Sequence, residues 1–77
     1  MDTKLDKLHS QAVDAALKQN WTDAIAYNLQ ILEADATYID AFLGLGFAYM
    51  QTGKLKDAKT QYKAALEIDP VNLIALN

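Results

Sequence analysis

The sequence predicts an all-α fold in which antiparallel helical hairpins stack into an α-α superhelix, with four helices and a short C-terminal helical stub. Two observations lead to this prediction. Apolar residues recur every three or four positions, a spacing that returns side chains to one side of an α-helix. In addition, the chain aligns with itself after a shift of about 34 residues, which is a suitable length for a pair of short helices.

The expected helices cover residues 3–18, 22–34, 38–51 and 55–68. Asn20 is placed to cap the second helix because its side chain can accept a hydrogen bond from a free backbone N–H, and Asp23 suits the positive end of the helix dipole. Thr37 is placed to cap the third helix. Gly53 follows the third helix and suits a left-handed terminal residue, and Pro70 ends the fourth helix.

The third and fourth helices each carry an apolar stripe, and together the two stripes predict a hairpin. The stripe of the third helix consists of Phe42, Leu45, Gly46 and Tyr49. The stripe of the fourth helix consists of Leu55, Ala58, Tyr62, Ala65, Leu66 and Ile68. Gly46, Ala58 and Ala65 are small enough for two helices to approach closely. We therefore expect these stripes to form the core of the hairpin.

The internal repeat is clearest where the second helix of each hairpin begins and where it ends. The identical pairs are Asp6 with Asp40, Asp23-Ala24 with Asp57-Ala58, Leu32-Glu33 with Leu66-Glu67, and Asp35 with Asp69. Apolar positions agree around these pairs, since Trp21 aligns with Leu55 and Ile31 with Ala65. The sequence therefore contains two diverged copies of one hairpin.

The second copy resembles the tetratricopeptide repeat family. The family's pattern has an aromatic residue, two residues, Leu-Gly, two residues and Tyr, then Ala, three residues and an aromatic residue, and finally Pro. In this chain the pattern falls on Phe42, Leu45, Gly46, Tyr49, Ala58, Tyr62 and Pro70. The first copy departs from it, with Gln11-Ala12 for Leu-Gly, Asn28 for the second aromatic residue and Ala36 for Pro, so we expect looser packing there.

The resemblance implies one tetratricopeptide-like domain over residues 1–77. Its first repeat would cover residues 5–38, its second repeat residues 39–72, and the stub residues 73–77. In this family the first helix of each hairpin lines a concave groove. The groove positions implied for this chain are Asp6, His9, Val13, Ala16, Leu17, Asp40, Leu43, Phe47, Met50, Gln51, Ile74 and Asn77.

The residues themselves point to the same surface. Leu43, Phe47 and Met50 form a second apolar stripe, about 100° around the third helix from its core stripe. Three explanations remain open: side chains of the second helices cover this stripe, a partner binds it, or copies of the chain associate through it. A flexible Met beside a Phe suits an adaptable contact surface, which favours a partner.

Composition excludes several classes of function. Zero Cys removes disulfides, thiolate catalysis and Cys-based zinc sites, and it favours a reducing, cytoplasmic compartment. The net charge of −3, with no Arg, argues against nucleic acid as a partner. No run of about 18 apolar residues is present for membrane insertion. His9 lacks the companions of a metal site, and Ser10 lacks a third member for a catalytic triad.

We therefore expect a scaffold or adaptor without enzymatic activity or cofactors, whose partner is a protein or peptide. An apolar or amphipathic peptide or helix would occupy the groove. The alternative is a structural repeat unit that forms a homo-oligomer through its exposed last helix and the stub residues Leu73, Ile74 and Leu76.

Overall fold

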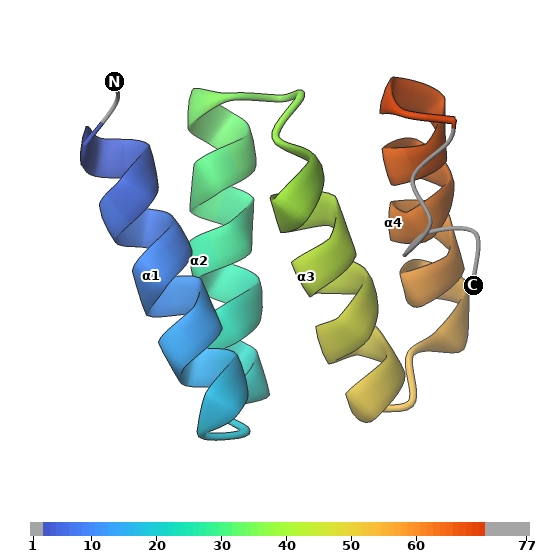
Figure 1. Cartoon of the computed structure of the whole chain (residues 1–77). Helices are drawn as coiled ribbons and strands as arrows, with labels where there is room; N and C mark the ends of the chain where they lie inside the picture. The colour runs from blue at the N-terminus through green and yellow to red at the C-terminus, as the bar shows by residue number, and fades with distance from the viewer. Residues whose placement is uncertain (1–2, 71–77) are drawn as a thin grey trace.

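A computed structural model describes residues 3–70 and contains four α-helices within that range. They are α1 (Thr3–Leu17), α2 (Trp21–Ala34), α3 (Ile39–Gln51) and α4 (Leu55–Ile68). The helices pack in sequence order, so that α1 with α2 and α3 with α4 form two antiparallel hairpins, and α2 packs against α3 (Figure 1). The all-α hairpin fold predicted from the sequence is confirmed, with helix ends within one residue of expectation.

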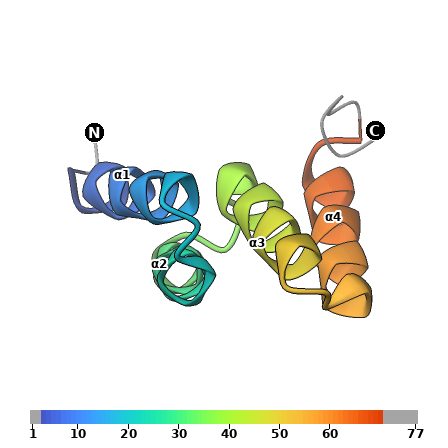
Figure 2. The same ribbon diagram turned by 90° about the horizontal axis from the view of Figure 1, so that it is seen from below.

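The hairpins stack so that α1 and α3 run in the same direction. Both helices begin at the end of the molecule that holds the α2–α3 connection, and both finish at the end that holds the α1–α2 and α3–α4 turns (Figure 1). Figure 2 shows α2 beside α1 at one end of the row and α4 beyond α3 at the other. Residues at the starts of α1 and α3 therefore share one end of the molecule, and residues at their ends share the other.

The core lies along the contacts between neighbouring helices. Its buried apolar residues are Leu8, Ala12, Ala15, Ala24, Ile31, Ala41, Leu45, Ala48, Ala58 and Ala65. Ile31 and Leu45 are the largest fully buried side chains. The many alanines follow from the short distance between helix axes, because a larger side chain would hold the helices apart.

Two glycines let α3 approach the helices on both of its sides. An added Cβ at Gly46 would lie 2.8 Å from the ring of Tyr62 on α4, within the same hairpin. An added Cβ at Gly44 would lie 2.7 Å from Nδ2 of Asn28 on α2, in the preceding hairpin. Helix packing therefore explains the Gly44-x-Gly46 sequence, since each glycine faces a different neighbour.

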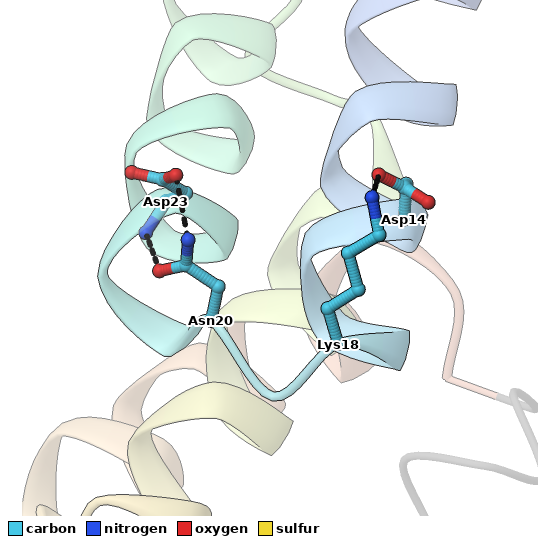
Figure 3. Close-up of polar contacts among 4 residues, drawn as sticks. All are labelled: Asp14, Lys18, Asn20 and Asp23. Atoms are coloured by element: carbon cyan, nitrogen blue, oxygen red, sulfur yellow. Dashed lines mark hydrogen bonds and ion pairs between the residues drawn. The ribbon is translucent and has the colours of Figure 1, made fainter.

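The turn after α1 forms as the sequence predicts. Oδ1 of Asn20 accepts a hydrogen bond from the backbone N–H of Asp23 at 3.4 Å, and its Nδ2 donates to Oδ2 of Asp23 at 2.8 Å (Figure 3). Asn20 is therefore the N-cap of α2. Gly53, just after α3, has a φ of 80°, the left-handed conformation that glycine adopts without strain.

The expected cap of α3 is wrong. Tyr38 occupies the N-cap position and makes no side-chain cap bond. Thr37 instead turns back toward the end of α2, where its backbone N–H and its hydroxyl both donate to Oδ1 of Asp35, at 3.0 and 2.7 Å. The carboxylate of Asp35 is a stronger acceptor than a neutral group, so it holds the Thr37 hydroxyl.

Two expectations about packing also need correction. Leu55 and Ile68 belong to the expected core stripe of α4, but both are exposed, one at each end of that helix. Asn28 does not loosen the first repeat: it is buried, and its Nδ2 donates to the backbone carbonyl of Ala24 at 3.0 Å. A satisfied buried amide fills the place of the family's aromatic ring.

Candidate functional site

The predicted groove residues of the described chain follow the parallel faces of α1 and α3. Leu45 is fully buried, whereas Phe47 is 47% exposed and Met50 49% exposed on another side of the same helix. On α1, Val13 is 44% exposed. The other positions are half-buried at His9, Ala16 and Leu43, and exposed at Asp6, Leu17, Asp40 and Gln51. Ile74, Asn77 and the self-association residues Leu73, Ile74 and Leu76 lie outside residues 3–70.

The half of this face near the helix C-termini is apolar. Phe47 packs edge-on against the indole of Trp21, with ring centroids 5.5 Å apart and an interplanar angle of 73°. Trp21 is the first residue of α2, so a side chain of the second helix covers one edge of the Phe47 ring. About half of that ring stays exposed. The second helix α2 therefore covers the Phe47 side chain only in part.

The sequence analysis aligned Trp21 with Leu55 and did not anticipate the contact between Trp21 and Phe47. The two rings come from different helices and from different hairpins. Helical periodicity relates residues within one helix, so it carries no information about this pair. This contact can be found only when the relative placement of the two hairpins is known.

The half of the face near the helix N-termini carries negative charge around Tyr38. The ring of Tyr38 lies 5.9 Å from that of His9, measured between centroids. Partial burial raises the pKa of Tyr38, and the carboxylates of Asp40, Asp6 and Asp35 raise it further. Acidic groups from α3, α1 and the α2–α3 connection therefore converge on one phenol.

Asp35 keeps its charge over a wide pH range. The hydroxyl and the backbone N–H of Thr37 donate to its carboxylate and lower its pKa below the usual value for aspartate. This charge contributes stability that is present above the unfolded-state pKa and lost as the pH falls through the lower folded-state pKa. Asp35 therefore stays ionised at a lower pH than an ordinary aspartate.

A model of the tetratricopeptide repeat family matches residues 15–76, well over half of the chain. The chain belongs to the tetratricopeptide repeat family. No curated protein matches it. A tetratricopeptide repeat is a protein–protein interaction module, and the family is in general a non-enzymatic scaffold, so the face of α1 and α3 is a candidate protein-binding surface.

Other polar groups of this tetratricopeptide repeat chain have local structural roles. Nζ of Lys18 lies 3.0 Å from Oδ2 of Asp14, one helical turn earlier on α1, and both side chains are exposed (Figure 3). Such a pair adds a few tenths of a kcal/mol to a helix, about 0.3 to 0.5. A shallow hollow lies beside it, lined by Gln11, Asp14, Ala15, Lys18, Asn20, Asp23 and Tyr27.

The described residues offer neither a metal cluster nor a membrane span. Between residues 3 and 70, no three His, Asp or Glu side chains are grouped so that they would hold a metal ion. None of the four helices in that range is both long and apolar enough to cross a membrane.

Proposed function

We propose that this tetratricopeptide repeat chain is an adaptor that binds an apolar or amphipathic peptide or helix of another protein. The binding face is the groove face: His9, Val13 and Leu17 of α1 with Asp40, Leu43, Phe47, Met50 and Gln51 of α3. The observation that carries the proposal is the exposure of Phe47 and Met50 on a helix whose opposite side is already buried.

The chemistry of these side chains supports a helical or extended peptide ligand. A helix that is apolar on two sides exposes surface whose removal from water is favourable, by about 25 cal/mol per Å². The ring of Phe47 is held by Trp21, and a half-exposed, oriented aromatic ring is a common anchor in protein interfaces. Met50 adds an adaptable side chain beside it.

The first prediction concerns Phe47→Ala. A peptide selected on the wild-type domain from a display library of amphipathic helices should bind this variant at least tenfold more weakly, because the anchor ring is gone. Helicity by circular dichroism and the melting temperature should change little, since half of the ring is already in water. Titration calorimetry measures the affinity.

Leu29→Ala is the matched control for Phe47→Ala. Leu29 is 46% exposed, much like Phe47, but it lies on α2 and not on the groove face. Affinity should be unchanged in this variant. If both variants lose affinity alike, or if Phe47→Ala lowers the melting temperature as strongly as the binding, the groove proposal is wrong.

A second function, self-assembly, is favoured by the exposure of Leu55. Leu55 aligns with Trp21, and Trp21 is packed against Phe47 of the next hairpin, whereas Leu55 is 64% exposed. The start of α4 therefore offers the same kind of contact point that α2 uses. A further helix from a second copy would bury it, as repeat arrays bury each hairpin against the next.

The second prediction tests assembly by light scattering on a size-exclusion column over a hundredfold dilution. If copies associate through α4, the wild type should exceed the monomer mass of 8.5 kDa when concentrated and dissociate on dilution. Leu55→Ser should then remain monomeric throughout, and so should a variant with Leu73, Ile74 and Leu76 made polar. A wild-type monomer at every concentration would contradict assembly and leave the groove proposal standing.

A further inference from the structure

The groove face has an electrical polarity along its length. Because α1 and α3 run in the same direction, their starts share one end of the molecule (Figure 1). Asp6 and Asp40 lie in the first turns of these helices, and Asp35 lies in the adjacent connection. At the other end the exposed groove residues are uncharged: Val13, Leu17, Phe47, Met50 and Gln51.

We propose that the occupant of this face is a protein segment with Lys or Arg at one end and aliphatic or aromatic residues at the other. Its basic end lies against Asp6, Asp35 and Asp40, and its apolar end packs on Phe47, Met50 and Val13. This inference rests on the proposed groove function and names the chemistry of the partner.

The acidic end is distinct from the lysines of α1. An α-helix turns by about 100° per residue, so Lys4 and Lys7 project from the side of α1 away from His9 and Val13. The final carbonyl groups of α2 carry the negative end of its dipole here, but the positive N-terminal ends of α1 and α3 oppose it, so the negative charge of this end comes from the three carboxylates. Basic ligands are therefore attracted to this end of the face, and acidic ones are repelled.

Asp6 and Asp40 also suit the positive ends of their own helices, but this role does not account for the whole cluster. Every helix has one acidic residue in its first turn, and Asp23 and Asp57 hold that place in α2 and α4. The acids of α1 and α3 share their end of the molecule with Asp35, and all three act on the phenol of Tyr38. Each first-turn acid stabilises its own helix, and in addition Asp6, Asp35 and Asp40 together concentrate negative charge at one end of the groove face.

The helical rise sets the length of the partner segment. Ten residues separate Asp40 from Met50, which corresponds to about 15 Å along α3 at about 1.5 Å per residue. A helical partner would span the same distance with about ten residues, and an extended one with four or five. The basic and apolar residues of the ligand should be separated accordingly.

The test uses synthetic 14-residue amphipathic helical peptides that carry Leu and Phe at one end and three Lys at the other. They are made with the lysines at the N-terminus or, separately, at the C-terminus, and each has analogues with Gln or Glu in place of Lys. At low ionic strength, the better Lys peptide should bind about three- to tenfold more tightly than its Gln analogue, and the Glu analogue most weakly. The preference should vanish at about 1 M salt, because exposed charges are then screened.

The double variant Asp6→Asn/Asp40→Asn should reduce the preference for Lys over Gln to less than twofold. Asp23→Asn/Asp57→Asn is the matched control, since it removes two first-turn charges at the opposite end of the molecule, and it should retain the preference (Figure 1). Equal binding of Lys and Gln analogues to the wild type would overturn the polarity inference but keep the groove. Binding that survives Phe47→Ala undiminished, or no binding of any peptide, would overturn the groove proposal itself.

Discussion

Gln19 and Gly53 occupy equivalent positions in the two repeats, and both have a left-handed backbone. Gln19 has a φ of 59° and Gly53 a φ of 80°. In each hairpin the next residue returns a backbone hydrogen bond to the end of the first helix, from Asn20 to the carbonyl of Ala15 at 2.8 Å and from Lys54 to that of Tyr49 at 2.8 Å. The two turns therefore share one geometry, and only the second has the residue that adopts it without strain.

The third prediction is that Gln19→Gly stabilises the fold. The left-handed conformation costs a residue with a Cβ about 1 to 2 kcal/mol, and glycine removes this cost. Because glycine is also more flexible in the unfolded chain, part of this stabilisation is lost again. We expect a net increase of about 1 kcal/mol in the free energy of unfolding, or roughly 4 to 8 °C in melting temperature. Gly53→Gln should have the opposite effect. An unchanged or lower melting point for Gln19→Gly would show that Gln19 gains compensating contacts.

The residue scale also shows where capping rules succeed and fail. Asn20 caps α2 because the nearest free N–H groups are those of its own helix. Thr37 lies one position before Tyr38, which is the N-cap of α3, and its hydroxyl donates to the carboxylate of Asp35. A capping rule applied to the sequence includes neither this alternative hydrogen bond nor the start of α3 one residue later than expected, so it placed Asn20 correctly and Thr37 wrongly.

Within the second hairpin, Gly46 and Tyr62 form a matched pair. An added Cβ at position 46 would come within 2.8 Å of the Tyr62 ring, so the glycine fixes how closely α3 and α4 approach. The equivalent positions in the first hairpin hold Ala12 and Asn28. A larger residue on the first helix thus accompanies a smaller one on the second.

The fourth prediction is that Gly46→Leu destabilises the fold by about 1 to 3 kcal/mol, because a leucine forces the Tyr62 ring and the α4 backbone to move. Urea unfolding followed by circular dichroism measures the change. Phe47→Leu, one residue further along the same helix, is the control and should change stability by less, since its side chain is half in water. Wild-type stability in Gly46→Leu would mean that α3 and α4 do not approach as closely as described.

Helix limits were predictable to within one residue, whereas burial was predictable only in the middle of each helix. The periodic stripe placed Leu45 and Ala65 correctly in the core, where both are fully buried. It also placed Leu55 and Ile68 there, and they are exposed, because a stripe does not state whether another element covers the ends of the helix. The spacing of apolar residues is a local property of the sequence, whereas their burial depends on which other elements pack against the helix.

At the scale of the whole molecule, the two hairpins meet where Asn28 lies against Gly44. The amide of Asn28 is held by its hydrogen bond to Ala24, so it cannot turn away from an incoming side chain without losing a buried partner. This contact joins α2 of the first repeat to α3 of the second. It couples the stability of one repeat to that of the other, as expected for a chain of nearest-neighbour units.

The fifth prediction is a double-mutant cycle across this contact. Gly44→Ala should destabilise the protein, since its Cβ would lie 2.7 Å from Nδ2 of Asn28. Asn28→Ala should also destabilise it by leaving a cavity. The double variant should lose less than the sum of the two, because the second change makes room for the first. Additive losses in urea unfolding would show that the two positions do not touch.

The groove face is a prediction from the sequence, whereas the packing of Trp21 against Phe47 and the acidic residues near Tyr38 are visible only in the structure. Counting steps of about 100° along one helix separates Phe47 from Leu45. The same counting does not reveal that Asp6, Asp35 and Asp40 all act on the phenol of Tyr38, since they come from three separate segments. Such combinations depend on the angle between hairpins, which no single helix encodes.

The close approach of α3 to a neighbour on each side has a thermodynamic consequence for recognition. Asn28 holds one flank of this helix and Tyr62 the other, at glycines only two residues apart and just before Phe47. The backbone just before the exposed ring is thus packed closely on both sides before any encounter. Ordering entropy in a complex would then be lost mainly by the arriving segment, and affinity would depend on how well that segment is preorganised as a helix. Stapled or otherwise constrained peptides should therefore gain more affinity here than any further stiffening of the domain.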